Sequence, residues 1–145
     1  MPKLISINAS LPKEVDFEGQ KVITSIFKEP IEGRIILRRL NLDGDKQADL
    51  TVHGGPDKAV YAYPIEHYEF WRKVYPDIKM PNGMFGENFT TEDQVNVGDI
   101  FRIGSAKVIA TYLECYVTNW ALNSDVWISS NSFWQADVQA YILEY

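Results

Sequence analysis

The sequence has a single cysteine, and its N-terminus has no long hydrophobic run. The one thiol among its 145 residues, Cys115, excludes an internal disulfide. The first residues lack the apolar stretch of a signal peptide or a membrane span. With 14 basic residues against 20 acidic ones and a net charge of −6, the chain has little attraction for a phosphate backbone. We therefore expect a cytoplasmic protein whose partners include neither a nucleic acid nor a membrane.

The C-terminal part of the chain lacks basic residues, glycine and proline. All 14 Lys and Arg residues lie at or before Lys107, the last glycine is Gly104 and the last proline is Pro81. The surface of a folded domain ordinarily carries charges of both signs throughout. The composition of this segment therefore needs an explanation of its own.

The sequence before this segment predicts short strands joined by turns. With 46% hydrophobic residues, it can form one domain with a substantial core. Short β-branched and apolar runs alternate with Gly, Pro, Asn and Asp, which predicts strands at residues 4–8, 21–27, 34–42, 48–53, 59–63, 95–103 and 107–113. One helix is predicted over residues 64–75, where Pro64 suits the first turn and Pro76 ends the helix. Tyr68, Trp71 and Tyr75 share one face of this helix, which we interpret as core packing. The pattern predicts a mainly β domain, a barrel or a sandwich, with one or two short helices.

The densest group of chemically useful residues lies between Asp49 and Tyr61. Here a predicted strand ends in His53-Gly54-Gly55, and Lys58 follows closely. Paired glycines let backbone N–H groups approach a ligand, while His53 and Lys58 can supply a proton or a positive charge to a phosphate or an oxyanion. The alternative is a hairpin with a capped turn, and the residues alone do not separate the two.

Three other features of the sequence are candidate sites. In the loop of residues 82–91, Glu87 and Asn88 can bind a heterocycle, or they can hold the loop together through bonds to the backbone. The acidic run of residues 43–45 resembles the start of a calcium loop, but the later ligands and the terminal glutamate are missing, so calcium is rejected. Cys115 is either a reactive thiolate or a small buried hydrophobe.

Several of these stretches resemble the MOSC domain family, and in particular its small stand-alone bacterial members. The matching residues are 33–45, 47–50, 52–63, 83–91 and 97–99. The resemblance implies a β-barrel like the small domain of pyruvate kinase and a pocket for the molybdenum cofactor in its molybdopterin form. Related activities are sulfur transfer and the reduction of N-hydroxylated bases. A small-molecule substrate or cofactor and a redox partner protein are implied as partners.

The resemblance also assigns roles to individual residues. It implies that the pocket is lined by His53, Gly54, Gly55, Lys58, Glu87 and Asn88. His53 or Glu87 moves protons, the glycines hold the pterin phosphate, and a cysteine thiolate binds the metal.

The resemblance stops after Thr111. Family members continue there with a Gln-Pro-Arg-Met-Pro-Cys-Tyr-Lys-Leu-Gly pattern, whereas in this chain Cys115 arrives two residues early and lacks the flanking Pro and Lys. No metal ligand is therefore assigned to this chain. Residues 116–124 can be written with codons that the genetic code permits for them. When these codons are read in a shifted frame that starts at the third base of each, they encode Cys-Tyr-Lys-Leu-Gly-Ile-Lys-Phe. Tryptophan has a single codon, so the shifted frame must encode Gly after Trp120, Asp after Trp127 and Ala after Trp134. All three residues fit this reading.

These observations lead to the hypothesis of a frameshift caused by one base lost near the codon for Tyr112. We predict that residues 1–111 are the intact part of a single MOSC domain and that residues 112–145 are an aberrant segment, so that the barrel is incomplete at the C-terminus. Two functions stay open: a molybdenum-cofactor protein, inactive in this form if the metal ligand is lost, or a non-catalytic binding module or truncated gene remnant.

Overall fold

The computed structural model describes residues 3–17, 19–50, 54–93, 95–115, 119–123, 126–129 and 136–144. Side chains are described as far as residue 111, with the exception of Asp57. No helix within these ranges is both long enough and apolar enough to cross a membrane.

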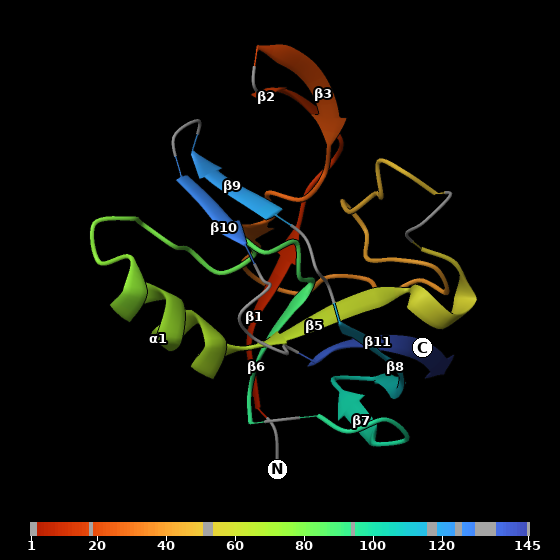
Figure 1. Ribbon diagram of the computed structural model, residues 1–145. Helices are drawn as coiled ribbons and strands as arrows, with labels where there is room; N and C mark the ends of the chain where they lie inside the picture. The colour runs from red at the N-terminus through yellow and green to blue at the C-terminus, as the bar shows by residue number, and fades with distance from the viewer. Residues whose placement is uncertain are drawn as a thin grey trace.

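A seven-stranded sheet forms the body of the protein (Figure 1). Its strand order is β4-β1-β6-β5-β11-β8-β7. The strands are β1 (Lys3–Ala9), β4 (Glu29–Pro30), β5 (Val60–Pro64), β6 (Phe89–Glu92), β7 (Ile100–Ile103), β8 (Ala106–Cys115) and β11 (Ala136–Glu144). All neighbouring strands are antiparallel except β5 and β6, which run parallel.

Two hairpins and two short helices complete the described structure. One hairpin consists of β2 (Lys13–Phe17) and β3 (Gln20–Thr24), the other of β9 (Asn119–Asn123) and β10 (Val126–Ser129). In Figure 1 the β2–β3 hairpin extends away from the main sheet. The 3-10 helix η1 (Pro56–Lys58) precedes β5, and α1 (Ile65–Val74) follows it directly.

The parallel pair β5–β6 needs a crossover connection, and α1 lies in that connection. Glu66 in the first turn and Arg72 in the last complement the helix dipole. Tyr68 and Trp71 are buried, which confirms the predicted packing face. They belong to an aromatic cluster with Tyr63 and Phe85, while a second cluster of aliphatic residues around Leu42 and Val60 packs on the sheet.

The prediction of a mainly β domain with one α-helix is confirmed. The closed barrel stays a prediction, because the sheet order begins at β4 and ends at β7, with no pairing between them in the described ranges. The strand predicted over residues 34–42 is wrong. That segment has a single bridge, between Leu37 and Leu42, because it folds into a turn in which Arg38 donates its N–H to the Asn41 carbonyl and pairs with Asp43.

Within the predicted aberrant segment, β11 pairs with β5 and with β8. At the end of β8, Cys115 lies opposite Ala136 of β11. These ladders consist of backbone hydrogen bonds, which do not require a particular side-chain sequence. The division of the chain at residue 111 therefore stays a prediction.

Candidate functional site

The glycine loop, residues 54–58, presents open backbone next to a lysine. Gly54 and Gly55 have φ values of +88° and +100°, a conformation that residues with side chains rarely adopt. A Cβ on Gly54 would lie 3.3 Å from Cδ of Gln47, whereas a Cβ on Gly55 would meet no atom of the described residues within 4 Å. The Lys58 N–H donates to the Gly55 carbonyl at 3.1 Å, which closes the loop as η1. Within the described part of the chain, one face of Gly55 is therefore uncovered.

Glu87 lies in the interior, where one carboxylate oxygen accepts three hydrogen bonds. The Tyr68 hydroxyl and the Gly83 N–H each donate to its Oε1 at 2.7 Å, and the Thr90 hydroxyl donates at 2.8 Å. The residue is fully buried, and Oε2 has no hydrogen-bond partner among the described residues. Burial raises the pKa of Glu87, because the charged form loses its hydration, and the hydrogen bonds oppose this rise. Burial is also the main reason that the pKa of Tyr68 is raised.

The Glu87 carboxylate ties α1 to the start of the loop that precedes β6. Tyr68 lies on α1, and its hydroxyl also accepts the Met84 N–H at 3.1 Å. The loop is packed closely at Gly83, where a Cβ would lie 2.6 Å from the Lys28 carbonyl oxygen. Glu87 therefore holds the loop against the helix.

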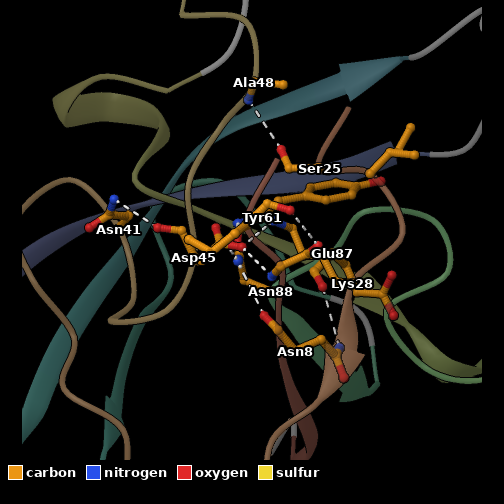
Figure 2. A network of polar contacts seen from close by, with 12 residues as sticks. Asn8, Ser25, Lys28, Asn41, Asp45, Ala48, Tyr61, Glu87 and Asn88 are labelled. Carbon is orange, nitrogen blue, oxygen red and sulfur yellow. Dashed lines mark hydrogen bonds and ion pairs between the residues drawn. The ribbon is translucent and has the colours of Figure 1, made fainter. Parts of the chain in front are cut away.

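Asn88 belongs to a polar network, shown in Figure 2, that meets the contacts of Glu87 at Asn8, whose Nδ2 donates to the Glu87 carbonyl at 3.3 Å and to Thr90 Oγ1 at 3.0 Å. Its Oδ1 accepts the Tyr61 N–H at 3.1 Å, and its own N–H donates to the Tyr61 carbonyl at 2.8 Å. Its Nδ2 donates to Asp45 Oδ2 at 2.9 Å and to the Asn8 carbonyl at 3.3 Å. The Asp45 carboxylate also forms a buried ion pair with Lys28. Asn88 thus joins the start of β5, the end of β1 and the chain around Asp45.

The predicted site residues therefore divide into two groups. Gly54, Gly55 and Lys58 lie together in the glycine loop, whereas Glu87 and Asn88 are buried in the two polar networks. His53 lies outside the described residues. The cofactor-binding and proton-transfer roles implied for these residues stay predictions.

Sequence reasoning missed several members of the networks. Tyr68 was assigned to packing alone, Asp45 was considered only as a calcium ligand, and Asn8 and Lys28 were not singled out. Their partners lie far away in the sequence, as the bond between Asn8 and Thr90, which are 82 positions apart, illustrates. No local pattern reveals such contacts.

The chain belongs to the MOSC domain family, whose sequence pattern matches residues 49–132. The uncharacterized protein YflK of Bacillus subtilis is 44% identical over 109 residues, covering 72% of this chain and 49% of YflK. Protein YiiM of Escherichia coli is 40% identical over 105 residues, covering 67% of this chain and 47% of YiiM. The chain thus spans about half the length of these relatives.

More distant similarity extends to a reductase and to a solved structure. A protein of Gibberella moniliformis named reductase is 30% identical over 96 residues, covering 59% of this chain and 16% of that protein. The crystal structure of a hypothetical protein has a TM-score of 0.70 at 25% identity, covering 99% of this chain and 63% of that one. The family match ends beyond Thr111, inside the segment predicted to be out of frame.

Proposed function

We propose that this protein binds the phosphate-bearing part of the molybdenum cofactor at the glycine loop. The MOSC domain family, to which the chain belongs, is associated with that cofactor. The observation that carries the proposal is the accessible backbone of Gly55, three residues from the positive charge of Lys58. An anion bound there would gain both backbone N–H donors and a favourable charge.

The described residues fit the anionic end of the cofactor. Among the described residues, Gly55 leaves the space that a Cβ would fill, and the side chain of Lys58 carries the positive charge that suits phosphate oxygens. At the metal end, His53 and the side chains after Thr111 lie outside the described part, so no step is derived through the metal. The role of the loop is to bind and orient the phosphate, while Lys58 offsets its charge.

For a protein with the intact metal-binding cysteine of the family, the reaction that we propose is the reduction of an N-hydroxylated compound, for which the bound cofactor would supply two-electron transfer. The N–O bond breaks, two electrons from a redox partner protein and two protons are consumed, and the amine and water are formed. The distant Gibberella reductase supports redox chemistry. We assign the proton-donating role to His53, since the Glu87 carboxyl is fully buried and engaged with Tyr68, Gly83 and Thr90.

The variant Gly55→Ala tests this proposal, with Gly98→Ala as a matched control. Gly98 has a φ of +92° and, like Gly55, nothing within 4 Å of its Cβ position, so both substitutions carry similar backbone strain. We expect Gly55→Ala to weaken the binding of inorganic phosphate by about tenfold or more, since the added Cβ occupies the space through which the ligand approaches the backbone, and one displaced contact is of that size. Gly98→Ala should bind phosphate like the unaltered protein.

Phosphate affinity is measured by titration, and the pterin content of protein purified from a host that makes the cofactor is measured in parallel. If the unaltered protein binds neither phosphate nor pterin, or if both variants lose binding equally, the glycine loop is not the site.

We also propose that residues 112–145 are read out of frame, so that this chain lacks the metal-binding cysteine of its family. The absence of Lys, Arg, Gly and Pro after Lys107 supports this proposal. A frameshift favours the second candidate function, which is a non-catalytic binding module or gene remnant that binds an anion without catalysing a reaction. If the purified protein contains molybdenum and reduces an N-hydroxylated base, this second candidate function is wrong. Resequencing the gene across the codon for Thr111 tests the frame directly.

A further inference from the structure

We infer that Asp45 and Asn88 form one positioning unit that holds both ends of the glycine loop. The unit deepens the proposed function, because it concerns the loop to which phosphate binding was assigned. At the end of the loop, Tyr61 follows Lys58 by three residues at the start of β5. Asn88 binds both backbone groups of Tyr61, accepting its N–H at 3.1 Å and donating to its carbonyl at 2.8 Å. The exit of the loop is therefore fixed by Asn88.

At the first glycine of the loop, the chain around Asp45 provides a side-chain contact from Gln47. Asp45 Oδ1 accepts the Ser10 N–H at 3.0 Å, and its backbone carbonyl accepts the Asn41 amide at 3.2 Å. Two residues later, Gln47 packs against Gly54, whose Cβ position lies 3.3 Å from Cδ of Gln47. A shift of Asp45 would therefore be transmitted to the first glycine of the loop.

A single hydrogen bond joins these two anchors. Asn88 Nδ2 donates to Asp45 Oδ2 at 2.9 Å, and both residues are buried, with 3% and 5% of their surface exposed. A buried bond between an amide and a carboxylate is stronger than one between neutral groups, because water does not compete with it. Lys28 compensates the charge of Asp45. Entrance and exit of the loop are thus held in one arrangement before any ligand binds, which lowers the cost of ordering the site.

The substitution Asn88→Asp breaks the unit without changing its size. It places a carboxylate oxygen against Asp45 Oδ2 where the amide donor was, while the oxygen that accepts the Tyr61 N–H is kept. The double variant Asp45→Asn/Asn88→Asp restores the bond between positions 45 and 88 with its direction reversed, because an amide at position 45 again donates to a carboxylate at position 88. The bond from position 88 to the Asn8 carbonyl is lost in both variants, so the comparison between them isolates the bond to position 45. Tyr68→Phe is the control, since it removes buried hydrogen bonds to Glu87 and Met84 that do not involve the glycine loop.

The test is amide hydrogen exchange of the ligand-free protein over residues 54–61, with inorganic phosphate affinity as the second measurement. We expect Asn88→Asp to accelerate exchange there by about tenfold or more and to weaken phosphate binding. The double variant should recover most of both losses. Tyr68→Phe should accelerate exchange over residues 83–87 and leave residues 54–61 unchanged. If Asn88→Asp fails to fold, Asp45→Asn alone, which leaves Lys28 without its counter-charge, supplies the same comparison.

The outcomes separate this inference from the proposed function. Unchanged exchange over residues 54–61 in Asn88→Asp, or equal acceleration in Tyr68→Phe, overturns the positioning unit whatever the protein binds. Faster exchange with recovery in the double variant, in a protein that never binds phosphate, supports the unit and rejects the proposed function.

Discussion

The close approach of two chain segments at Gly83 provides the sharpest test of the packing. We expect Gly83→Ala to destabilise the protein much more than Gly98→Ala. The two glycines have nearly the same φ, +89° and +92°, so the strain of a left-handed alanine, about 1–2 kcal/mol, is common to both variants. They differ in their surroundings, because a Cβ on Gly83 would lie 2.6 Å from the Lys28 carbonyl oxygen and 3.0 Å from Cβ of Asn8.

The magnitude follows from what must move. The nearest atom to the added Cβ is backbone, and Lys28 is held there by its N–H, which donates to the Gly83 carbonyl at 3.1 Å. The Gly83 N–H donates in turn to Glu87, so a shift of residue 83 also disturbs the buried carboxylate. Overpacking of this kind costs about 1–3 kcal/mol beyond the shared strain, which gives roughly 2–5 kcal/mol for Gly83→Ala.

Urea denaturation of both variants measures the difference. With a slope of about 1–3 kcal/mol per molar urea, an additional loss of this size lowers the midpoint by on the order of 1 M. The m-value should stay the same, since the variants expose similar surface on unfolding. If Gly83→Ala proves no less stable than Gly98→Ala, the contact between residue 83 and the Lys28 backbone is not as close as described.

Three further predictions concern single side chains. Burial raises the pKa of Glu87, so the protonated carboxyl stabilises the folded protein fully below about pH 4, and this stabilisation is lost as the pH rises through the raised pKa. The urea midpoint of the unaltered protein should therefore fall between about pH 4 and 8, whereas the midpoint of Glu87→Gln should not. Burial lowers the pKa of His67, whose Nδ1 is buried without a hydrogen-bond partner in the described structure. The free energy of unfolding should therefore fall as the pH drops below about 6.5 in the unaltered protein, but not in His67→Phe. Cys115→Ser should leave the cofactor content unchanged, whereas restoring the frame after Thr111 should create molybdenum binding that depends on the newly encoded cysteine; a loss of molybdenum in Cys115→Ser would contradict the frame proposal.

Much of the fold follows from local sequence patterns. The alternation of apolar and polar residues located β1, β5 and most of β8, and the two prolines flanking α1 set its limits to within about a residue. Local patterns did not predict strands β2, β4, β6, β9, β10 and β11. Residues 34–42 were predicted to be a strand although only one bridge forms there, and residues 48–50, the described part of the strand predicted over 48–53, form no strand. β6 is short and polar, and its pairing with β1 and β5 decides its conformation more than its own residues do.

For the candidate site, the sequence by itself determined which residues were worth attention and where the glycine loop would turn. Paired glycines permit the positive φ values that Gly54 and Gly55 adopt, and this tendency to turn is a local property of the sequence. Only the tertiary structure decided what Glu87 and Asn88 do, because their partners on β1, on α1 and at Asp45 come from distant parts of the chain. The folding of the elements around this loop determines which buried groups Glu87 and Asn88 meet.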